Sequence, residues 1–301
     1  MAVTISVGSG KGGTGKSMLV ANLAMLLARH GKKVYLIDLD VGGADAHILF
    51  GLFEPQHTLT DFLERRVETL EETAHTLDSF YGLNLIVGTG DTLKTANMTY
   101  QTKQRLLRHI ALLDADLVLI DVGAGTGFHV LDFFMFADRQ ICVTTPEPTA
   151  VLDFYRFLKL AAIRKALGAF IAHDQVHKTL VGGNFQTLEE VLQLAEKTRE
   201  GAREQAAAAL GEFQPWLVIN QVGRKAAINK GQLRQVVSKF LGLSLPELGE
   251  IPFDPVIRES VGAYMPVSEY TPASPPARAL QVIVDQLRQD LEAGALKARA
   301  A

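Results

Sequence analysis

Cysteine is nearly absent from this chain, and so are long hydrophobic runs and any excess of one charge. The single cysteine, Cys142, excludes an internal disulfide and a metal site built on a cysteine pair. The longest apolar run, residues 18–28, is interrupted by Asn22 and is too short to span a bilayer. The 30 lysines and arginines against 33 acidic residues give no general attraction to nucleic acid or membrane. The chain also starts with a predicted strand rather than a signal peptide, so we expect a reduced, cytoplasmic setting.

What the chain does contain is an alternation of short apolar strands and helices. Apolar residues make up 48% of it, enough for a substantial core. Strands are predicted at residues 4–7, 33–38, 83–87, 117–121, 140–145, 216–220 and 248–251. Helices are predicted at residues 17–30, 99–113, 149–167, 229–241 and 277–291. The alternation predicts an α/β fold, with a mainly parallel twisted sheet and helices on both faces.

Residues 168–213 depart from this rhythm and predict a helical insertion. Thr187 and Glu190 have the spacing of a capping box, which would open one helix running to about Leu210. The insertion either covers a sheet edge or offers a surface to a partner. Linker-like composition occurs only at residues 270–276, so a single domain over residues 1–301 is expected, with a C-terminal helix and tail at 277–301.

Gly8 to Ser17 reads GSGKGGTGKS and contains a phosphate-binding motif. Gly10, Gly15, Lys16 and Ser17 satisfy G-x-x-x-x-G-K-[ST], in which backbone N–H groups surround the phosphates of a nucleotide. Lys16 would reach the β and γ phosphates, and the Ser17 hydroxyl would bind Mg²⁺. The predicted strand before the loop and helix after it are the context that this motif requires.

The loop contains a second lysine, Lys11, beside its first glycine. Because Lys16 already serves the phosphates, Lys11 needs another explanation. It is either a solvated loop lysine or a cation for a charge outside its own subunit.

Acidic residues end two of the predicted strands. Asp38 and Asp40 are two positions apart, so their side chains would point to the same side of an extended chain. Asp40 is the candidate for orienting a water molecule for phosphoanhydride hydrolysis. Asp121 ends another apolar strand before Val122-Gly123-Ala124-Gly125, the arrangement that binds Mg²⁺ in phosphate-loop enzymes. Without the phosphate loop, Asp38 and Asp40 would be interpreted as a pair of solvated acids at a strand end.

These motifs together carry a resemblance. KGGTGKS at 11–17, DLDVGGADAH at 38–47 and DVGAG at 121–125 resemble the deviant-Walker-A P-loop ATPases of the MinD/ParA class. The similarity extends to Ile219-Asn220-Gln221 and to Ile251-Pro252-Phe253-Asp254. Within the class the motifs are most similar to the FlhG-like regulators of flagellar number, which share Gly123 where MinD has proline.

The resemblance implies a slow Mg²⁺-dependent ATPase that forms an ATP-dependent homodimer and acts in spatial positioning, with an unknown protein partner or activator. It implies that Lys11 crosses the dimer interface to the partner's ATP, and that Lys11, Lys16 and Asp40 are catalytic. Ser17, Asp40 and Asp121 would hold Mg²⁺. The ATP or ADP would contact Gly10, Lys11, Gly12, Gly13, Thr14, Gly15, Lys16, Ser17, Met18, Asn220, Pro252, Phe253 and Asp254.

The sequence leaves open whether such a dimer binds to a membrane or to DNA. The C-terminal residues 281–301 have no aromatic residue and little basic excess, which is unlike a membrane-targeting helix. A basic stretch is formed by Arg224, Lys225, Lys230, Arg234 and Lys239, and it either binds DNA without sequence preference or is a solvated helix face. Peripheral action at the inner membrane face or the cell pole is expected from the resemblance.

Two other function classes share the predicted fold. A metal-cluster carrier or metal-insertion ATPase would present a cysteine pair at its dimer interface, and Cys142 stands alone in an apolar strand. A biosynthetic ligase of the dethiobiotin-synthetase type would need a polar substrate pocket that the sequence does not reveal.

Overall fold

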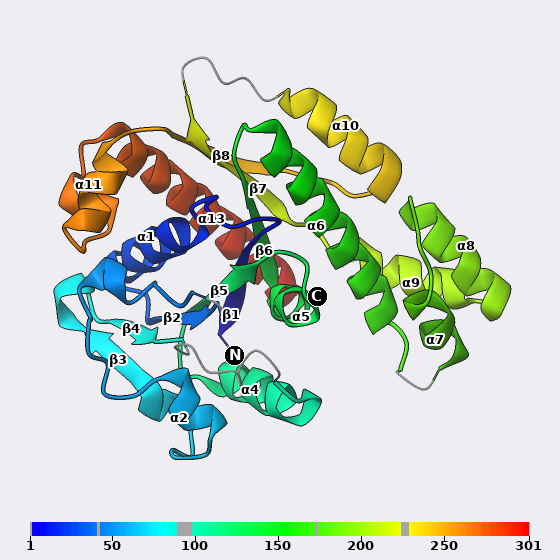
Figure 1. Ribbon diagram of the computed structural model, residues 1–301, viewed down its shortest axis with the longest axis horizontal. Coiled ribbons are helices and arrows are strands. Elements are labelled where there is room, and N and C mark those ends of the chain that lie inside the picture. Colours follow the sequence, from blue (N-terminus) through cyan, green and yellow to red (C-terminus); the bar gives the residue numbers. More distant parts are fainter. Residues whose placement is uncertain (1, 41–42, 89–97, 172–173, 224–228, 301) are drawn as a thin grey trace.

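The computed structural model describes residues 2–40, 43–88, 98–171, 174–223 and 229–300. Its centre is an eight-stranded sheet in the order β3-β4-β2-β5-β1-β6-β7-β8 (Figure 1). The strands are β1 (Val3–Ser9), β2 (Val34–Leu39), β3 (Ala74–Leu77), β4 (Leu83–Ile86), β5 (Leu117–Ala124), β6 (Arg139–Thr144), β7 (Trp216–Val222) and β8 (Glu247–Pro252). All neighbours pair in parallel except β3 and β4. The predicted α/β fold and all seven predicted strands are therefore confirmed.

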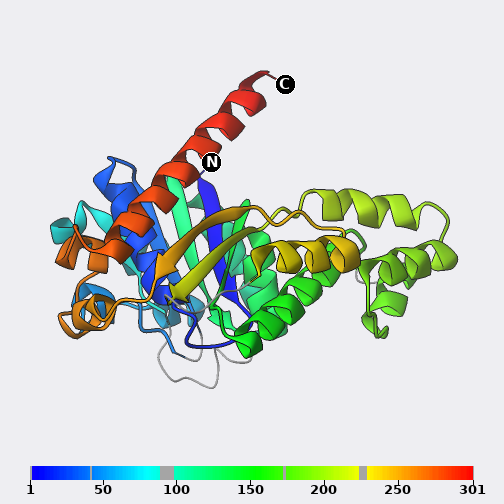
Figure 2. The same cartoon turned by 90° about the horizontal axis from the view of Figure 1, so that it is seen from above.

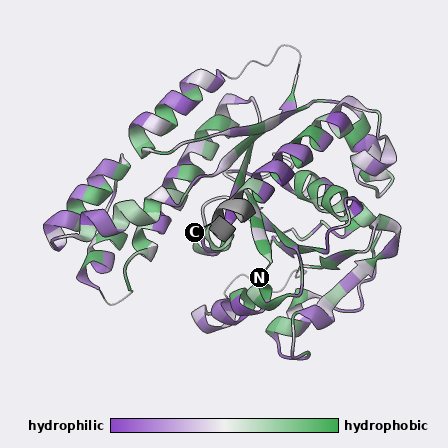
Figure 3. Cartoon of the chain, turned by 180° about the vertical axis from the view of Figure 1, so that it is seen from behind, coloured by the Kyte–Doolittle hydropathy of each residue, from purple (hydrophilic) through white to green (hydrophobic). Residues whose placement is uncertain are grey.

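Helices cover both faces of the sheet, because both faces of its strands are apolar. One face packs against α1 (Lys16–Arg29), α12 (Val267–Tyr270) and α13 (Pro275–Ala300). The other packs against α2 (Leu59–Leu63), α4 (Tyr100–Leu112), α5 (Phe128–Phe136), α6 (Pro148–Gly168) and α10 (Lys230–Leu241). The short α11 (Val256–Gly262) follows β8. Figure 3 shows the resulting contrast between the mostly hydrophobic strands and the more hydrophilic peripheral helices.

The carboxyl ends of the parallel strands determine where a site can form. The phosphate loop follows β1, and β1 lies between β5 and β6. The acids of β2 and β5 and the ends of β7 and β8 reach the same edge of the sheet. A parallel sheet thus brings all the predicted motifs to one side of the molecule.

The predicted helical insertion is present, but the helix predicted to run from Thr187 to about Leu210 is divided into two helices. The segment forms α7 (Gln175–Val181), α8 (Leu188–Thr198) and α9 (Ala202–Gly211), which extend from one end of the molecule (Figure 2). The single helix predicted to run to Leu210 was wrong. Gly201 has φ 77°, and the Glu196 carboxylate accepts the N–H groups of Gly201 and Arg203, which starts a new helix. The Thr187 cap was predicted correctly, since its side chain accepts the Glu190 N–H.

The strand β3 was not predicted. It is a four-residue antiparallel strand at the sheet edge, and none of its residues is buried, so it lacks the apolar run by which the others are recognised. The predicted C-terminal helix is longer than expected, because α13 continues to Ala300 and projects beyond the sheet (Figure 2). In the described part of the chain no helix is long and apolar enough to cross a membrane. The single-domain organisation over 1–301 stays a prediction.

Candidate functional site

The phosphate loop connects β1 to α1, as the sequence predicts. Gly13 and Gly15 have φ 77° and 87°, a conformation that side chains rarely adopt. Gly15 caps α1 without a side-chain hydrogen bond, so the first N–H groups of the helix remain available to an anion. Lys16 is buried at the base of the loop, with Ser17 partly exposed beside it. The geometry is that of a phosphate-binding cradle.

Close neighbours leave no room for a side chain at two positions of the loop, Gly10 and Gly15. A Cβ on Gly10 would lie 2.1 Å from the carbonyl oxygen of Asp153 on α6. A Cβ on Gly15 would lie 2.1 Å from Nδ2 of Asn220 at the end of β7. The loop is therefore packed against α6 on one side and β7 on the other. Thr14 is buried between them, and its hydroxyl has no hydrogen-bond partner among the described residues.

The acids of β2 and β5 lie side by side. Asp38 pairs in register with Asp121 on the neighbouring strand, and both are almost completely buried. Asp38 accepts the N–H groups of Asp40 (3.0 Å) and Ala46 (3.1 Å), so it holds the loop after β2 rather than facing an open site. Val41 and Gly42 of this loop lie outside the described residues.

Asp40 reaches the carboxyl end of β5. Its Oδ1 lies 3.1 Å from the position that a Cβ on Gly123 would occupy, so glycine at 123 allows this approach. The structure thus brings Asp40, Asp121 and Ser17 together, the three residues predicted to hold Mg²⁺. The described residues contain no group of three histidine, cysteine or acidic side chains arranged to bind a metal alone. An Mg²⁺ ion here would take its other ligands from phosphate and water.

The electrostatics of Asp121 fit such an ion. Neither carboxylate oxygen of Asp121 has a hydrogen-bond partner of good geometry among the described residues. Burial raises the pKa of Asp121 to about 6, against the opposing effect of the Ser17 hydroxyl and the Lys16 ammonium; the charge of Asp40 adds to the rise. Burial and the charge of Asp121 likewise raise the pKa of Asp38. The cluster carries buried negative charge that a divalent cation would stabilise.

Lys11 lies at the outer side of the loop and contacts the segment after β6. Its ammonium nitrogen lies 3.2 Å from the Glu147 carboxylate and 3.3 Å from the Thr149 hydroxyl, at the start of α6. The ion pair is partly solvent-exposed. In the chain by itself, Lys11 therefore folds back onto its own subunit.

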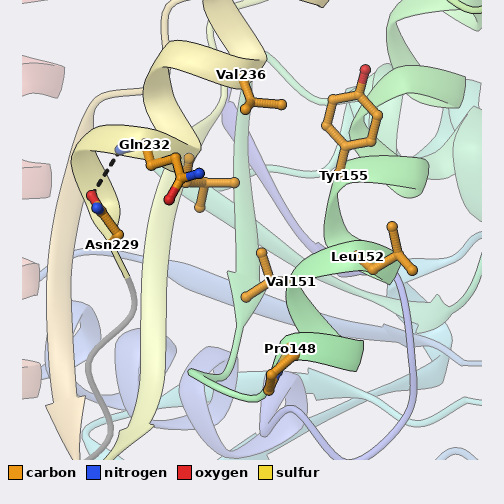
Figure 4. A pocket seen from close by; sticks show the side chains of 8 residues that line it. Pro148, Val151, Leu152, Tyr155, Asn229, Gln232 and Val236 are labelled. Carbon is orange, nitrogen blue, oxygen red and sulfur yellow. Dashed lines mark hydrogen bonds between the residues drawn. The ribbon is translucent and has the colours of Figure 1, made fainter.

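An apolar groove of about 360 Å³ lies beside this contact (Figure 4). It runs between α6, which contributes Pro148, Val151, Leu152 and Tyr155, and α10. Leu152 is half exposed there. On the side of α10 the groove is lined by Leu233 and Val236 and by the polar side chains of Asn229 and Gln232.

The residues outside the phosphate loop that were predicted to contact ATP or ADP lie at or just after the ends of β7 and β8. Asn220 is 1% exposed, and its amide donates to the Thr14 carbonyl at 2.9 Å. Pro252 pairs with the end of β7, and the Phe253 N–H donates to the Val222 carbonyl. Phe253 is 64% exposed and free to cover a flat group. The Asp254 carboxylate instead caps α11 through the Val256 N–H.

Comparison with known proteins agrees with this geometry. The family model ParA, described as NUBPL iron-transfer P-loop NTPase, matches residues 1–167, which is more than half of the chain. The chain belongs to the ParA family. It is an ATPase of the MinD/ParA class, as the motifs indicate.

Relatives of this ParA-family chain include flagellar and septum proteins. It is 25% identical over 286 residues to the antiactivator FleN of Pseudomonas aeruginosa, covering 94% of this chain and 85% of FleN. It is 32% identical over 163 residues to the flagellum site-determining protein YlxH of Helicobacter pylori, covering 54% of each. The chain thus matches about half of YlxH. Septum site-determining MinD from Pyrococcus horikoshii, complexed with Mg-ADP, has the same fold, with a TM-score of 0.68 and 24% identity over 95% of this chain and 96% of MinD.

Three contacts of the site were missed by sequence reasoning. Glu147 and Thr149 follow the predicted strand at 140–145, so their place at a strand end was the available signal. Gln221 follows Asn220 and was noted only within a similar segment. Its non-glycine left-handed backbone, with φ 58°, is a conformation that costs about 1–3 kcal/mol and is not visible in the sequence.

Proposed function

We propose that the protein is a dimerisation switch controlled by ATP, and that its dimer positions a cellular structure through state-dependent partner binding. The main support is Lys11, a second lysine on the outer side of the phosphate loop, whose ammonium contacts the exposed Glu147 and Thr149 of its own subunit. The relatives named for flagellar and septum placement support spatial positioning as the process, with flagellar number or placement, cell polarity, division or cargo as candidates. They also support a cytoplasmic location, with action at the inner membrane face or cell pole.

We assign the chemistry within a subunit to three groups. Lys16 and the loop N–H groups bind the phosphates, with Gly10, Lys11, Gly12, Gly13, Thr14, Gly15, Ser17 and Met18 around them. Ser17, Asp40 and Asp121 would hold Mg²⁺, which supplies charge neutralisation at the phosphates when bound. Asp40 orients the attacking water. Asn220 and the segment Pro252–Asp254 flank the base.

Lys11 then serves the second subunit. Two ATP molecules facing each other across a two-fold axis would repel, and a cation from each subunit offsets this repulsion only while ATP is bound. Exposed ion pairs such as Lys11–Glu147 contribute about 0–1 kcal/mol, so the side chain can leave Glu147 for a triphosphate at little cost.

The test is the oligomeric state of Lys11→Ala with Mg²⁺ and a non-hydrolysable ATP analogue. We expect the unchanged protein to elute as a dimer and the variant as a monomer, with dimerisation weakened by about 100-fold because two charge-assisted contacts are lost, each about 1.5 kcal/mol. Size-exclusion chromatography with light scattering measures this directly.

The matched control is Lys32→Ala, which removes an exposed lysine after α1 and should dimerise normally. Nucleotide binding by the Lys11→Ala monomer, measured by calorimetry, should persist. A Lys11→Ala protein that dimerises as readily as the unchanged one would contradict the proposed role.

Iron transfer, the activity in the description of the family model, is a second candidate that we disfavour. Cys142 is completely buried on β6, and burial raises the pKa of its thiol, so it is a poor metal ligand. We expect protein purified without chelators to contain less than about 0.1 iron atom per chain, measured by inductively coupled plasma mass spectrometry. Cys142→Ser should leave that value unchanged, and stoichiometric iron would contradict the switch as sole function.

The contacts of the basic stretch bear on whether DNA binds the dimer. Lys230 and Arg234 both pair with Glu247, at 2.9 and 2.7 Å, so of the three basic residues of α10 only the exposed Lys239 has no acidic partner among the described residues. Arg224 and Lys225 lie outside the described residues. We therefore propose that a protein partner, rather than DNA, is what mainly recognises the ATP-bound dimer.

A further inference from the structure

Gln221 contacts the phosphate loop, although it is not part of the phosphate-binding motif. Its side-chain amide donates to the Gly13 carbonyl at 3.1 Å. The preceding Asn220 donates to the Thr14 carbonyl at 2.9 Å and accepts the Gln221 N–H at 2.9 Å. We propose that Gln221 is a positioning residue of the phosphate loop, which, with Asn220, fixes the direction of the N–H groups that bind phosphate.

The geometry of the peptide bond explains how a contact outside the loop acts inside it. In a trans peptide the C=O and the following N–H point in opposite directions. The described residues contain no cis peptide. Holding the carbonyls of Gly13 and Thr14 toward β7 therefore turns the N–H groups of Thr14 and Gly15 away from β7, toward the inside of the loop. Gly13 and Gly15 would otherwise allow these peptides to rotate.

Two features of β7 show that the backbone is shaped for this contact. Gln221 has φ 58°, which a long side chain rarely adopts. The β7–β8 register also shifts between Ile219 and Val222, so the strand is irregular where Asn220 and Gln221 lie. Such irregularities redirect side chains and persist where surrounding contacts determine them. Here they aim two consecutive amides at consecutive carbonyls of one loop.

The inference rests on nucleotide binding by the phosphate loop, but not on dimerisation. It predicts a loss of phosphate affinity that is the same for any base. Two variants test it: Gln221→Met keeps the length of the side chain without a donor, and Gln221→Asn keeps a residue that tolerates left-handed backbone but is too short to reach Gly13. Gln193→Met, on α8 of the insertion, is the matched control because the Gln193 amide is exposed and donates to the exposed Glu189.

Affinities for ATP, inosine triphosphate and inorganic triphosphate are measured with Mg²⁺ by displacement of a fluorescent ADP. Both Gln221 variants should bind all three about fivefold more weakly, which corresponds to about 1 kcal/mol. The midpoint of thermal unfolding without nucleotide should be unchanged or raised for Gln221→Asn. A loss confined to ATP would show that Gln221 reads the base and overturn the inference. Affinities within twofold of the control for all three would overturn it as well. Failure of the dimer model would appear in light scattering and leave these affinities unaffected.

Discussion

The Asp40→Ala variant is expected to hydrolyse ATP roughly 100-fold or more slowly and to accumulate as a dimer at saturating ATP. Asp40 lies against Gly123, beside the buried Asp121 and outside the phosphate loop itself. Removing its carboxylate takes away the group that orients water while leaving the loop N–H groups and Lys16 in place. Phosphate release gives the rate, and light scattering gives the dimer fraction.

Two further variants make this result specific. Asp45→Ala removes an exposed carboxylate from the same loop and should behave like the unchanged protein. Adding Lys11→Ala to Asp40→Ala should return the protein to a monomer, because the trapped dimer would depend on the cross-subunit cation. An Asp40→Ala protein that stays monomeric with saturating ATP would refute the ATP-dependent dimer, and normal turnover would refute the role of Asp40.

Much of the sheet could be predicted because its strands are continuous apolar runs buried on both faces. The apolar runs predicted at 33–38 and 117–121 each end in an acid, and parallel pairing of these neighbouring strands brings the two acids together. Asp38 and Asp121 pair in register. The phosphate loop was also predictable, because its glycines and its lysine lie close together in the sequence.

The contacts that sequence reasoning missed depend on packing between distant segments. Lys11 and Glu147 are 136 positions apart, and no local pattern pairs them. The break between α8 and α9 is a local feature, because it lies at Gly201, a poor helix former with φ 77°, where the Glu196 carboxylate accepts the Gly201 N–H. The direction of Gln221 depends on a backbone irregularity of β7. The contacts of Lys11 and Gln221 are tertiary interactions, which local propensity does not reveal.

Asp121→Asn is expected to abolish measurable hydrolysis and yet to stabilise the nucleotide-free protein at pH 8. The hydrolysis is lost because a neutral amide holds Mg²⁺ poorly. The stabilisation follows because burial disfavours the Asp121 charge more than the Ser17 hydroxyl and the Lys16 ammonium favour it. The Asp121 pKa of about 6 in the folded state exceeds the ordinary value of 3.8, so ionisation costs the folded state at most roughly 3 kcal/mol.

Because the pKa of Asp121 is raised in the folded protein, the stabilisation by Asp121→Asn depends on pH in a definite direction. Because the folded protein holds the Asp121 proton more tightly than the unfolded chain, the unchanged protein loses stability as pH rises from about 4 to about 6. The advantage of Asp121→Asn should thus be a few degrees in melting temperature at pH 8 and should shrink below pH 5. Differential scanning calorimetry without Mg²⁺ or nucleotide measures both, with the exposed Asp78→Asn as control. A variant that is less stable at pH 8, or whose advantage does not depend on pH, would show that Asp121 is not an uncompensated charge. A stabilised and inactive variant would mean that the Asp121 carboxylate lowers the stability of the nucleotide-free protein. The residue is retained because Mg²⁺ and nucleotide balance its charge when they bind.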